Sequence, residues 1–319
     1  MTTGIVRKDR KMRELLASGR LVVSPGVYDG YSARLVQQMG FDAASTTGAG
    51  LANSALGMPD VGILGLLTNV DLCRHMARSI DIPLMADADT GYGNAVTVFH
   101  AIQYFEEAGV VGVNLEDQES PKRCGHLQGK TIIPAREMAK KIEAAVRAKR
   151  SSDFIINART DAIALEGIEG AQARVKMYQD AGADMVYPDS VRSLDDIERI
   201  LEVARVPVSI NIGFGIRVRA PTPMFSLPKL QAMGVARVSV PRIMLGAAIL
   251  AMRNALAALK DSRDDDAPPD RTDLCTDMGV IMGLLDYARI EKLEEEFMLE
   301  EDLAARYPNG KPNMLSEGH

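Results

Sequence analysis

The chain has 319 residues, of which 46% are hydrophobic and 25% charged, and it carries a formal net charge of −6. This composition is ordinary for a globular protein, and the negative net charge gives no support to nucleic-acid binding, which usually shows a basic surface. No apolar run approaches the ~20 residues that span a bilayer, so we expect neither nucleic acid nor membrane among its partners.

Short apolar runs alternate along the chain with longer segments whose apolar residues recur about every 3.6 positions. The expected strands cover residues 21–24, 43–46, 83–86, 112–115, 154–158, 185–187, 206–210 and 237–240. The clearest helical patterns cover residues 95–108, 135–148, 168–181 and 194–204. Strands that alternate with helices indicate βαβ units and a parallel sheet. Eight such strands predict an α/β fold of the closed (β/α)8, TIM-barrel type.

The alternative architecture is an open, doubly wound sheet that binds a dinucleotide. Its G-x-G-x-x-G fingerprint is absent after the first expected strand, where Ser24-Pro25-Gly26 stands instead. The two short G-x-G runs, at residues 48–50 and 213–215, fit tight loops between a strand and a helix. The closed barrel is therefore the favoured fold.

We expect the barrel domain to cover residues 1–260, followed by a linker and a C-terminal helical extension over residues 261–319. The linker prediction depends on residues 261–270, which are charged and contain two prolines. Residues 272–303 then show a strong helical pattern with apolar side chains. That apolar surface has to pack against a neighbouring subunit or against the chain's own barrel.

Polar side chains follow the expected strands three to seven. In a parallel barrel these C-terminal strand ends and the loops after them form the active face. The residues, in chain order, are Asp87, Asp89, Glu116, Asp117, Arg159, Asp161, Asp189 and Asn211. Any one of them could be a cap or turn residue, but the whole set on one rim indicates an active site.

Two of these carboxylates predict a metal site. Asp87 and Asp89 are two residues apart, so as strand residues they would face the same side of the sheet. Mg²⁺ is usually held by one or two carboxylates together with waters and substrate oxygens. Zinc is disfavoured because Cys124 and His126 have no second Cys or His at zinc-like spacing.

The segment Lys122-Arg123-Cys124-Gly125-His126 carries the second chemical signal. It joins one of the three cysteines to one of the four histidines, beside two cations that favour a thiolate. A free cysteine is often a buried structural thiol, an interpretation that fits Cys73 and Cys275 better than this polar, glycine-bounded loop. The three cysteines are odd in number and far apart in the sequence, so a disulfide framework is not expected. Together with a charged N-terminus that has no apolar secretory core, they predict a cytoplasmic protein.

Six motifs in order resemble those of the isocitrate lyase/phosphoenolpyruvate mutase superfamily, over about residues 10–260. They are Ser24-Pro-Gly-Val-Tyr-Asp29, Leu56-Gly-Met-Pro-Asp60, Asp87-Ala-Asp89, Glu116-Asp-Gln118, Lys122-Arg-Cys-Gly-His126 and Ala158-Arg-Thr-Asp161. The cysteine loop resembles that of the carbon–carbon lyase branch, which includes lyases of 2-methylisocitrate and 2,3-dimethylmalate.

The resemblance implies a barrel that forms a homotetramer, with a C-terminal helix exchanged between subunits. It implies Mg²⁺, for which Mn²⁺ can substitute, held by Asp87, with Asp89 and Glu116 acting through water and Asp60 in support. Cys124 would be the catalytic acid on a loop with Lys122 and His126, and Arg159 would bind the substrate carboxylate. The remaining predicted substrate-binding residues are Ser45, Thr46, Thr47, Gly48, Gly125, Asp189, Asn211 and Arg217.

The expected reaction is cleavage of the C2–C3 bond of a 2-hydroxy di- or tricarboxylate to a 2-oxo acid and a second carboxylate. Three positions depart from the lyase pattern: Ser45 stands in place of a tyrosine, Asp189 in place of a glutamate, and Gly213 in place of a threonine. They leave the substrate side chain and the general base open. An oxaloacetate decarboxylase or a phosphonate-processing enzyme is the alternative, against which Cys124 argues, and a non-catalytic barrel would show a broken metal shell.

Overall fold

A computed structural model describes residues 7–125, 129–214, 222–264, 266 and 268–308. Eight parallel strands form one sheet in the order β6-β5-β4-β3-β2-β1-β8-β7. They are β1 (Val22–Val27), β2 (Ala44–Thr46), β3 (Leu84–Asp87), β4 (Gly112–Glu116), β5 (Ile155–Thr160), β6 (Met185–Pro188), β7 (Ser209–Asn211) and β8 (Arg237–Val240). A parallel bridge between Val186 and Val208 brings β6 to β7 and nearly closes the ring. The predicted (β/α)8 barrel is confirmed.

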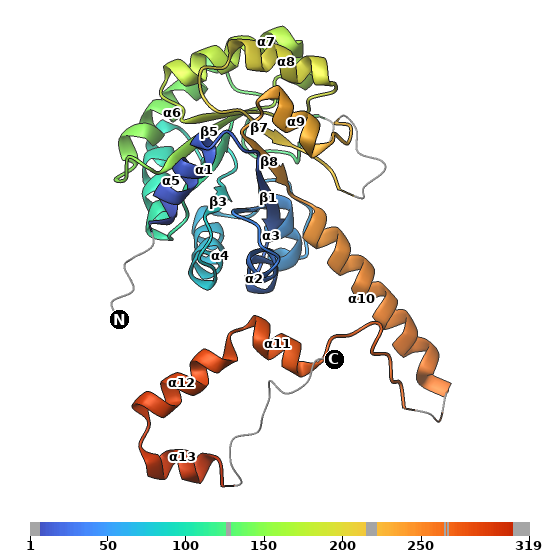
Figure 1. Cartoon of the computed structure of the whole chain (residues 1–319). Helices are drawn as coiled ribbons and strands as arrows, with labels where there is room; N and C mark the ends of the chain where they lie inside the picture. Colours follow the sequence, from blue (N-terminus) through green and yellow to red (C-terminus); the bar gives the residue numbers. More distant parts are fainter. Residues whose placement is uncertain (1–6, 126–128, 215–221, 265, 267, 309–319) are drawn as a thin grey trace. The chain divides into compact units, whose positions relative to one another are not determined.

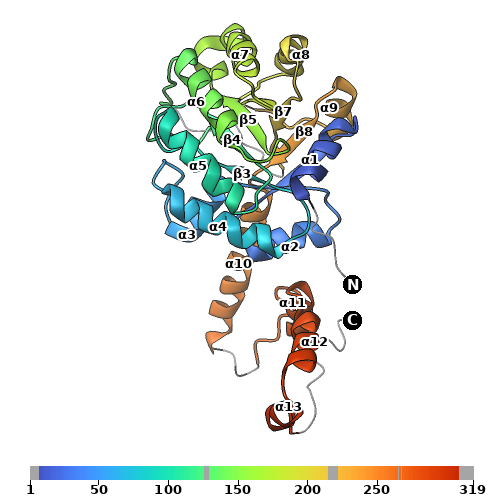
Figure 2. The ribbon, with the colours of Figure 1, turned by 90° about the vertical axis from the view of Figure 1, so that its left-hand side faces the viewer.

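The helices that accompany these strands are α1 (Lys8–Ala17), α2 (Gly30–Gln38), α3 (Gly48–Leu56), α4 (Leu66–Ser79), α5 (Ala95–Glu107), α6 (Ala135–Ala148), α7 (Ile163–Asp180), α8 (Leu194–Val203) and α9 (Leu227–Met233). Helices α2 to α9 surround the strands on the outside of this barrel (Figures 1 and 2), whereas α1 packs Met12 and Leu15 against residues at the starts of the strands. Apolar spacing explains their packing: in α6, Met138, Ile142 and Ala145 recur at i, i+4 and i+7 and are all fully buried.

The interior of the barrel contains a buried arginine as well as apolar side chains. Arg237, at the start of β8, is fully buried and donates hydrogen bonds to Ser24 Oγ at 3.1 Å and Ser209 Oγ at 3.0 Å. Burial disfavours its charged form and lowers the pKa of Arg237 to about 10. These contacts tie β8 to β1 and β7, the two strands beside it in the sheet.

The chain divides into two compact units, Met1–Leu245 and Gly246–His319. The division falls in the first turn of α10 (Ile243–Asp261). This helix has 19 residues and is long and apolar enough to cross a membrane by length and composition. The expectation that no apolar run approaches this length is therefore wrong. A single such helix is weak support for a membrane span, because a helix that packs on another protein surface has the same composition.

The second unit also contains a short 3-10 turn (Ser262–Asp264) and three short helices, α11 (Met278–Leu284), α12 (Tyr287–Phe297) and α13 (Glu300–Arg306). The helical pattern predicted over residues 272–303 is thus interrupted. Asp286 adopts a left-handed conformation with φ of 58° and separates α11 from α12. Met298 and Leu299 are extended and separate α12 from α13. Cys275, expected to be a structural thiol, is exposed, whereas Cys73 in α4 is buried.

Candidate active site

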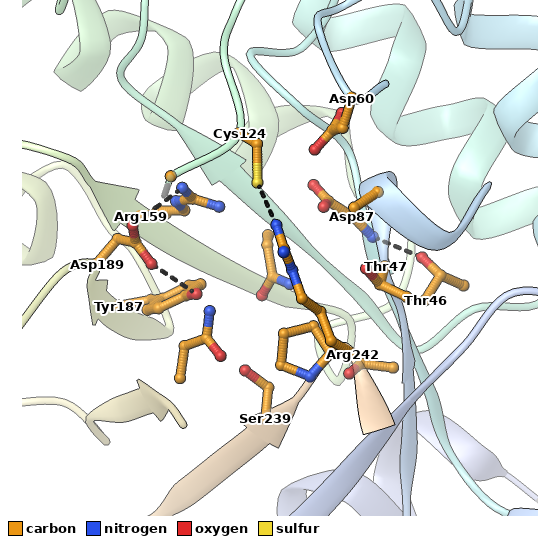
Figure 3. Close-up of a pocket in the computed structure, with 16 residues that line it drawn as sticks. Thr46, Thr47, Asp60, Asp87, Cys124, Arg159, Tyr187, Asp189, Ser239 and Arg242 are labelled. Atoms are coloured by element: carbon orange, nitrogen blue, oxygen red, sulfur yellow. Dashed lines mark hydrogen bonds and ion pairs between the residues drawn. The ribbon is translucent and has the colours of Figure 1, made fainter. Parts of the chain in front are cut away.

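A pocket of about 60 Å³ opens at the C-terminal ends of the strands, as the sequence predicted (Figure 3). Its lining combines carboxylates, amides, hydroxyls, one thiol and two arginines. The lining residues are Ser45, Thr46, Thr47, Ala49, Asp60, Asp87, Asn114, Cys124, Gly125, Arg159, Tyr187, Asp189, Asn211, Ser239, Pro241 and Arg242. At about 10–15 Å³ per water, this volume holds a small acid or a few waters.

Asp87 is the last residue of β3, and backbone donors fix its carboxylate. Gly48 N–H at the start of α3 donates to Oδ2 at 2.9 Å, and Asp89 N–H donates to Oδ1 at 3.1 Å. The Asp87 N–H itself donates to Thr46 Oγ1 at 2.9 Å. The expectation that Asp89 is a strand residue on the same face is wrong. Its φ of 48° places it in a turn, from which its side chain returns toward Asp87.

Lys122 extends from the cysteine loop into these acids. Its Nζ lies 2.6 Å from Asp60 Oδ1 and 2.9 Å from Asp89 Oδ1, and only 4% of its side chain is exposed. Burial acts to lower the pKa of Lys122, but the surrounding carboxylates outweigh it and raise that pKa well above the usual range. Burial also disfavours the charged form of Asp89 and raises its pKa to about 6, although Lys122 opposes the shift.

Glu116, the last residue of β4, is also buried among charges. Its Oε2 lies 3.1 Å from Arg159 Nη1, whereas Oε1 has no hydrogen-bond partner within the described chain. Burial raises the pKa of Glu116 well above its usual range despite the nearby Arg159. A buried acceptor without a partner costs free energy, so a cation or a bound water near Oε1 would stabilise this carboxylate.

The donor set suits Mg²⁺ held in part through water. A Cβ placed on Gly48 would lie 2.8 Å from Asp87 Oδ2, 3.3 Å from Asp89 Oδ1 and 3.3 Å from Lys122 Nζ, so a side chain at position 48 would fill the space between them. Within the described residues, no three His, Cys, Asp or Glu side chains converge closely enough to hold a metal by themselves. This agrees with Mg²⁺ chemistry, in which one or two carboxylates bind directly and waters complete the shell.

Arg159, near the end of β5, is surrounded by acids. Its Nε lies 2.9 Å from Asp161 Oδ2, Nη1 lies 3.1 Å from Glu116 Oε2, and Nη2 lies 3.3 Å from Asp189 Oδ2. Its guanidinium carbon also lies 5.3 Å from the centre of the Tyr187 ring. Burial acts against the charge, but these acids raise the pKa of Arg159 well above the usual range. All its nitrogens are thus engaged by the protein.

The described part of the cysteine loop is fixed at both ends. Cys124 N–H donates to Asp60 O at 3.2 Å, and Gln118 and Arg123 exchange two hydrogen bonds, of 2.9 and 3.0 Å. After the loop, the buried Lys130 donates to Gly125 O at 3.0 Å and pairs with Asp161 at 2.8 Å. These contacts place Cys124 over the pocket.

Gly125 packs directly on the arginine cluster. A Cβ at this position would lie 2.3 Å from Asp189 Oδ2 and 2.7 Å from Arg159 Nη2, well inside contact distance. Only glycine fits between the loop and the rim at this point. The cysteine loop and the β5–β6 edge are therefore complementary in shape.

Arg242 is the main site residue that the sequence analysis missed. It lies two residues after β8, and its Nη2 donates to Cys124 Sγ at 3.1 Å (Figure 3). The sequence analysis looked for functional side chains after strands three to seven. The same rule applied to the eighth strand would have found Arg242. Ser239, within β8, and Tyr187, within β6, line the same pocket and were missed because they lie within their strands rather than after them.

The structure brings most of the predicted site residues together. Ser45, Thr46, Thr47, Asp60, Asp87, Cys124, Gly125, Arg159, Asp189 and Asn211 line the pocket, and Gly48, Asp89, Glu116 and Lys122 contact its lining residues. His126 and Arg217 lie outside the described residues. Asp117 points away from the pocket and accepts hydrogen bonds from Arg174 and Tyr178.

Comparison with known proteins identifies the family to which the chain is similar. A family model described as phosphoenolpyruvate phosphomutase matches residues 12–260. The chain is 36% identical to 2,3-dimethylmalate lyase of Eubacterium barkeri over 287 residues, which cover 90% of this chain and 97% of that protein. It is 34% identical to 2-methylisocitrate lyase of Aeropyrum pernix over 302 residues, 94% of each chain. The solved structure of oxaloacetate acetylhydrolase with 3,3-difluorooxalacetate superposes with a TM-score of 0.82 at 32% identity, covering 91% of this chain and 96% of that one.

Proposed function

We propose a function from one premise: this chain belongs to the phosphoenolpyruvate phosphomutase family, within the isocitrate lyase/phosphoenolpyruvate mutase superfamily. Its relatives include lyases that cleave carbon–carbon bonds, and the chain is an enzyme of that type. Its reaction is cleavage of the C2–C3 bond of a small 2-hydroxy di- or tricarboxylate, which yields a 2-oxo acid and a second carboxylate. The observation that carries this proposal is the thiol of Cys124 held over a pocket that combines acids and cations.

The acids at the ends of β3 and β4 would hold Mg²⁺, or Mn²⁺ in its place, with Asp87 binding directly, Asp89 and Glu116 through water, and Asp60 in support. When bound, the ion supplies Lewis-acid polarisation of the substrate's 2-hydroxycarboxylate. Lys122 neutralises the acids that surround it and fixes the first residue of the cysteine loop among them. The residue that takes the hydroxyl proton stays unassigned.

The other residues bind and orient the substrate. Asn211 Oδ1 is buried, borders the pocket and accepts no hydrogen bond within the described chain, so it is available to a substrate hydroxyl or acid. Arg159, clamped by three carboxylates, contributes positive potential at a fixed position. Cys124 gives its proton to the carbon that leaves with the second carboxylate. His126 and Arg217 are assigned to the substrate on the resemblance alone.

Three further assignments belong to this proposal. The enzyme works in the cytoplasm, residues 1–260 form its catalytic domain, and residues 261–319 form an extension. The enzyme is a homotetramer in which a C-terminal helix is exchanged between subunits. The exposed apolar side chains of α10, among them Leu250 and Leu256, support the assembly because a soluble helix normally buries such side chains.

The test is a panel of substrates with Mg²⁺. 2,3-Dimethylmalate, 2-methylisocitrate and related 2-hydroxy acids are supplied in turn, and release of the 2-oxo acid is followed with a coupled dehydrogenase. We expect turnover with at least one, loss of turnover in EDTA and recovery with Mg²⁺ or Mn²⁺. Cys124→Ser should fold normally and nearly abolish cleavage, since a hydroxyl is a poor proton donor, whereas Cys275→Ser should stay active.

Oxaloacetate is the decisive alternative substrate, because one structural relative is an oxaloacetate acetylhydrolase. If oxaloacetate is consumed and every 2-hydroxy acid is left intact, the lyase proposal fails. The products then separate the remaining activities: acetate and oxalate indicate hydrolysis, whereas pyruvate and CO₂ indicate decarboxylation.

A further inference from the structure

The pocket contains two cationic side chains among its described lining residues, and they differ in their surroundings. Arg159 is paired with Glu116, Asp161 and Asp189, at distances between 2.9 and 3.3 Å. Arg242 has no carboxylate within 4.0 Å in the part of the chain that the structure describes, and its hydrogen bond goes to Cys124 Sγ. The positive charge of Arg242 is therefore the one that the protein leaves without an anion.

We propose that Arg242 binds the second carboxylate of the substrate and thereby selects dianionic over monoanionic 2-hydroxy acids. The proposal rests on the lyase function above, which it deepens. A guanidinium presents parallel N–H donors that match a carboxylate in a forked pair. Arg159 cannot offer such a pair without giving up one of its protein carboxylates.

The contact with Cys124 places Arg242 at the correct part of the substrate. The carbon that Cys124 protonates is bonded directly to the second carboxylate. When the C2–C3 bond breaks, the electron pair stays on this carbon and its negative charge is shared with that carboxylate. A guanidinium that reaches the sulfur at 3.1 Å also reaches a carboxylate one bond from the carbon. Arg242 therefore stabilises the negative charge that develops when the C2–C3 bond breaks.

The backbone that carries Arg242 is held in place by close packing. Gly26 in β1 approaches Pro241 so closely that a Cβ on Gly26 would lie 2.4 Å from the Pro241 Cα. In the adjoining pair, Pro25 is in register with Val240. The guanidinium thus extends from a fixed point across the pocket toward Cys124 (Figure 3).

The test compares two ligands that differ only in the second carboxylate. Malate and lactate both carry a 2-hydroxycarboxylate, but lactate has a methyl group where malate has its carboxymethyl group. Binding of each, and of oxalate as a reference, is measured by calorimetry with Mg²⁺ for the wild-type protein, Arg242→Gln and Arg242→Lys. The matched control is Arg192→Gln, because Arg192 lies in the loop after β6 and faces Asp196 of α8.

We expect Arg242→Gln to weaken malate binding about 10- to 100-fold, the usual effect of losing a charge-assisted contact. Lactate and oxalate binding should change less than about twofold, and the control should bind all three ligands as the wild type does. The malate affinity of Arg242→Lys should lie between those of the wild type and Arg242→Gln, because lysine keeps the positive charge but loses the paired N–H donors. An unchanged malate-to-lactate ratio in Arg242→Gln would overturn the proposal.

Failure of the lyase function gives a different result. If the wild-type protein cleaves no 2-hydroxy acid but Arg242→Gln still loses malate preference, Arg242 is a carboxylate receptor in an enzyme of another reaction. If the wild-type protein cleaves a dicarboxylate and Arg242→Gln lowers kcat without raising KM or changing the ligand ratio, Arg242 acts on Cys124 and the receptor assignment is wrong.

Discussion

Lys122 is the counter-charge of the acidic cluster in the protein alone. It lies among Asp60, Asp87, Asp89 and Glu116 with only 4% of its side chain exposed. Carboxylates buried together repel each other and lose hydration, so the cluster needs a cation. The proposed Mg²⁺ would offer the same compensation as the lysine, at the same place. Metal binding and the position of the cysteine loop are therefore expected to be coupled through this side chain.

Replacement of this lysine tests the coupling. Lys122→Met should lower the free energy of unfolding of the metal-free protein by about 3 kcal/mol or more, because buried carboxylates lose their partner. Mg²⁺ binds the folded state and should restore part of the loss, so its effect on Tm should be larger in the variant than in the wild type. Thermal unfolding with EDTA or Mg²⁺ measures both quantities.

Lys140→Met is the control, since Lys140 is 70% exposed and pairs with Glu143 on its own helix. It should change neither the stability nor the response to Mg²⁺ by more than a few tenths of a kcal/mol. Equal Mg²⁺-induced shifts of Tm in Lys122→Met and the wild type would show that the lysine does not share the site with the metal.

Gly125 allows the loop to approach Arg159 and Asp189. In Gly125→Ala the new methyl group would meet both side chains, so the loop has to move away and Cys124 moves with it. We expect kcat/KM to fall at least about 100-fold, since displacement of a catalytic group by about 1 Å has effects of this size. Gly30→Ala meets no atom within 4 Å and should keep full activity. Similar kinetics for the two variants would contradict the packing.

At the level of elements, the strands were predictable because their side chains repeat a simple pattern. The structure overlaps all eight predicted strands, and α6 begins and ends where its pattern did. The turn of Asp89 was not predictable, since an aspartate two residues after Asp87 fits a strand equally well. Arg242 was missed because the strand-end rule was applied to strands three to seven and not to β8.

The contacts between distant elements were also beyond the sequence. No spacing rule indicates that Lys122 of the cysteine loop reaches Asp89 after β3, or that Lys130 joins Gly125 to Asp161. These pairs depend on how the loops fold over the barrel. The list of site residues could thus be predicted in large part, whereas their partners could not.

The N-terminal helix provides a pH test at this scale. Asp9 in α1 accepts hydrogen bonds from Arg7 and from Ser151, in the turn before β5. The Arg7 hydrogen bond, opposed by burial, lowers the pKa of Asp9 from 3.8 to about 2. Because the folded-state pKa is depressed, the contribution to stability is present above pH about 4 and is lost as pH falls through about 2.

Asp9→Asn removes that contribution. We expect it to lower the free energy of unfolding at pH 7 by about 1 kcal/mol, a value discounted because Arg7 is 56% exposed. The difference from the wild type should shrink as the pH is lowered from about 4 toward 2, as measured by urea unfolding of the metal-free protein. Asp42→Asn, at an exposed carboxylate, is the control. A difference that stays constant over this range would exclude the pairing with Arg7.

At the scale of the whole molecule, α10 carries an apolar stripe. Ile249, Met252, Leu256 and Leu259 recur at helical spacing, so they share one face, and between 48% and 66% of each is exposed. None of the 19 residues of α10 is buried. A stripe of this kind on a helix indicates a protein surface that covers it. In the proposed assembly, another copy of the same chain provides such a surface. A partner of this kind is present wherever the protein itself is present.

The last prediction separates assembly from folding. Leu256→Glu combined with Met252→Glu should place two charges on the stripe and dissociate the proposed tetramer into smaller species, as measured by light scattering after size-exclusion chromatography. The circular dichroism of the chain should not change, because neither side chain is buried. Lys260→Glu, at the end of the same helix, should leave the assembly intact. A wild-type chain that is monomeric at micromolar concentration would contradict the assembly, and the stripe would then need another partner. If dissociation also abolishes cleavage while the barrel stays folded, the active site depends on a neighbouring subunit.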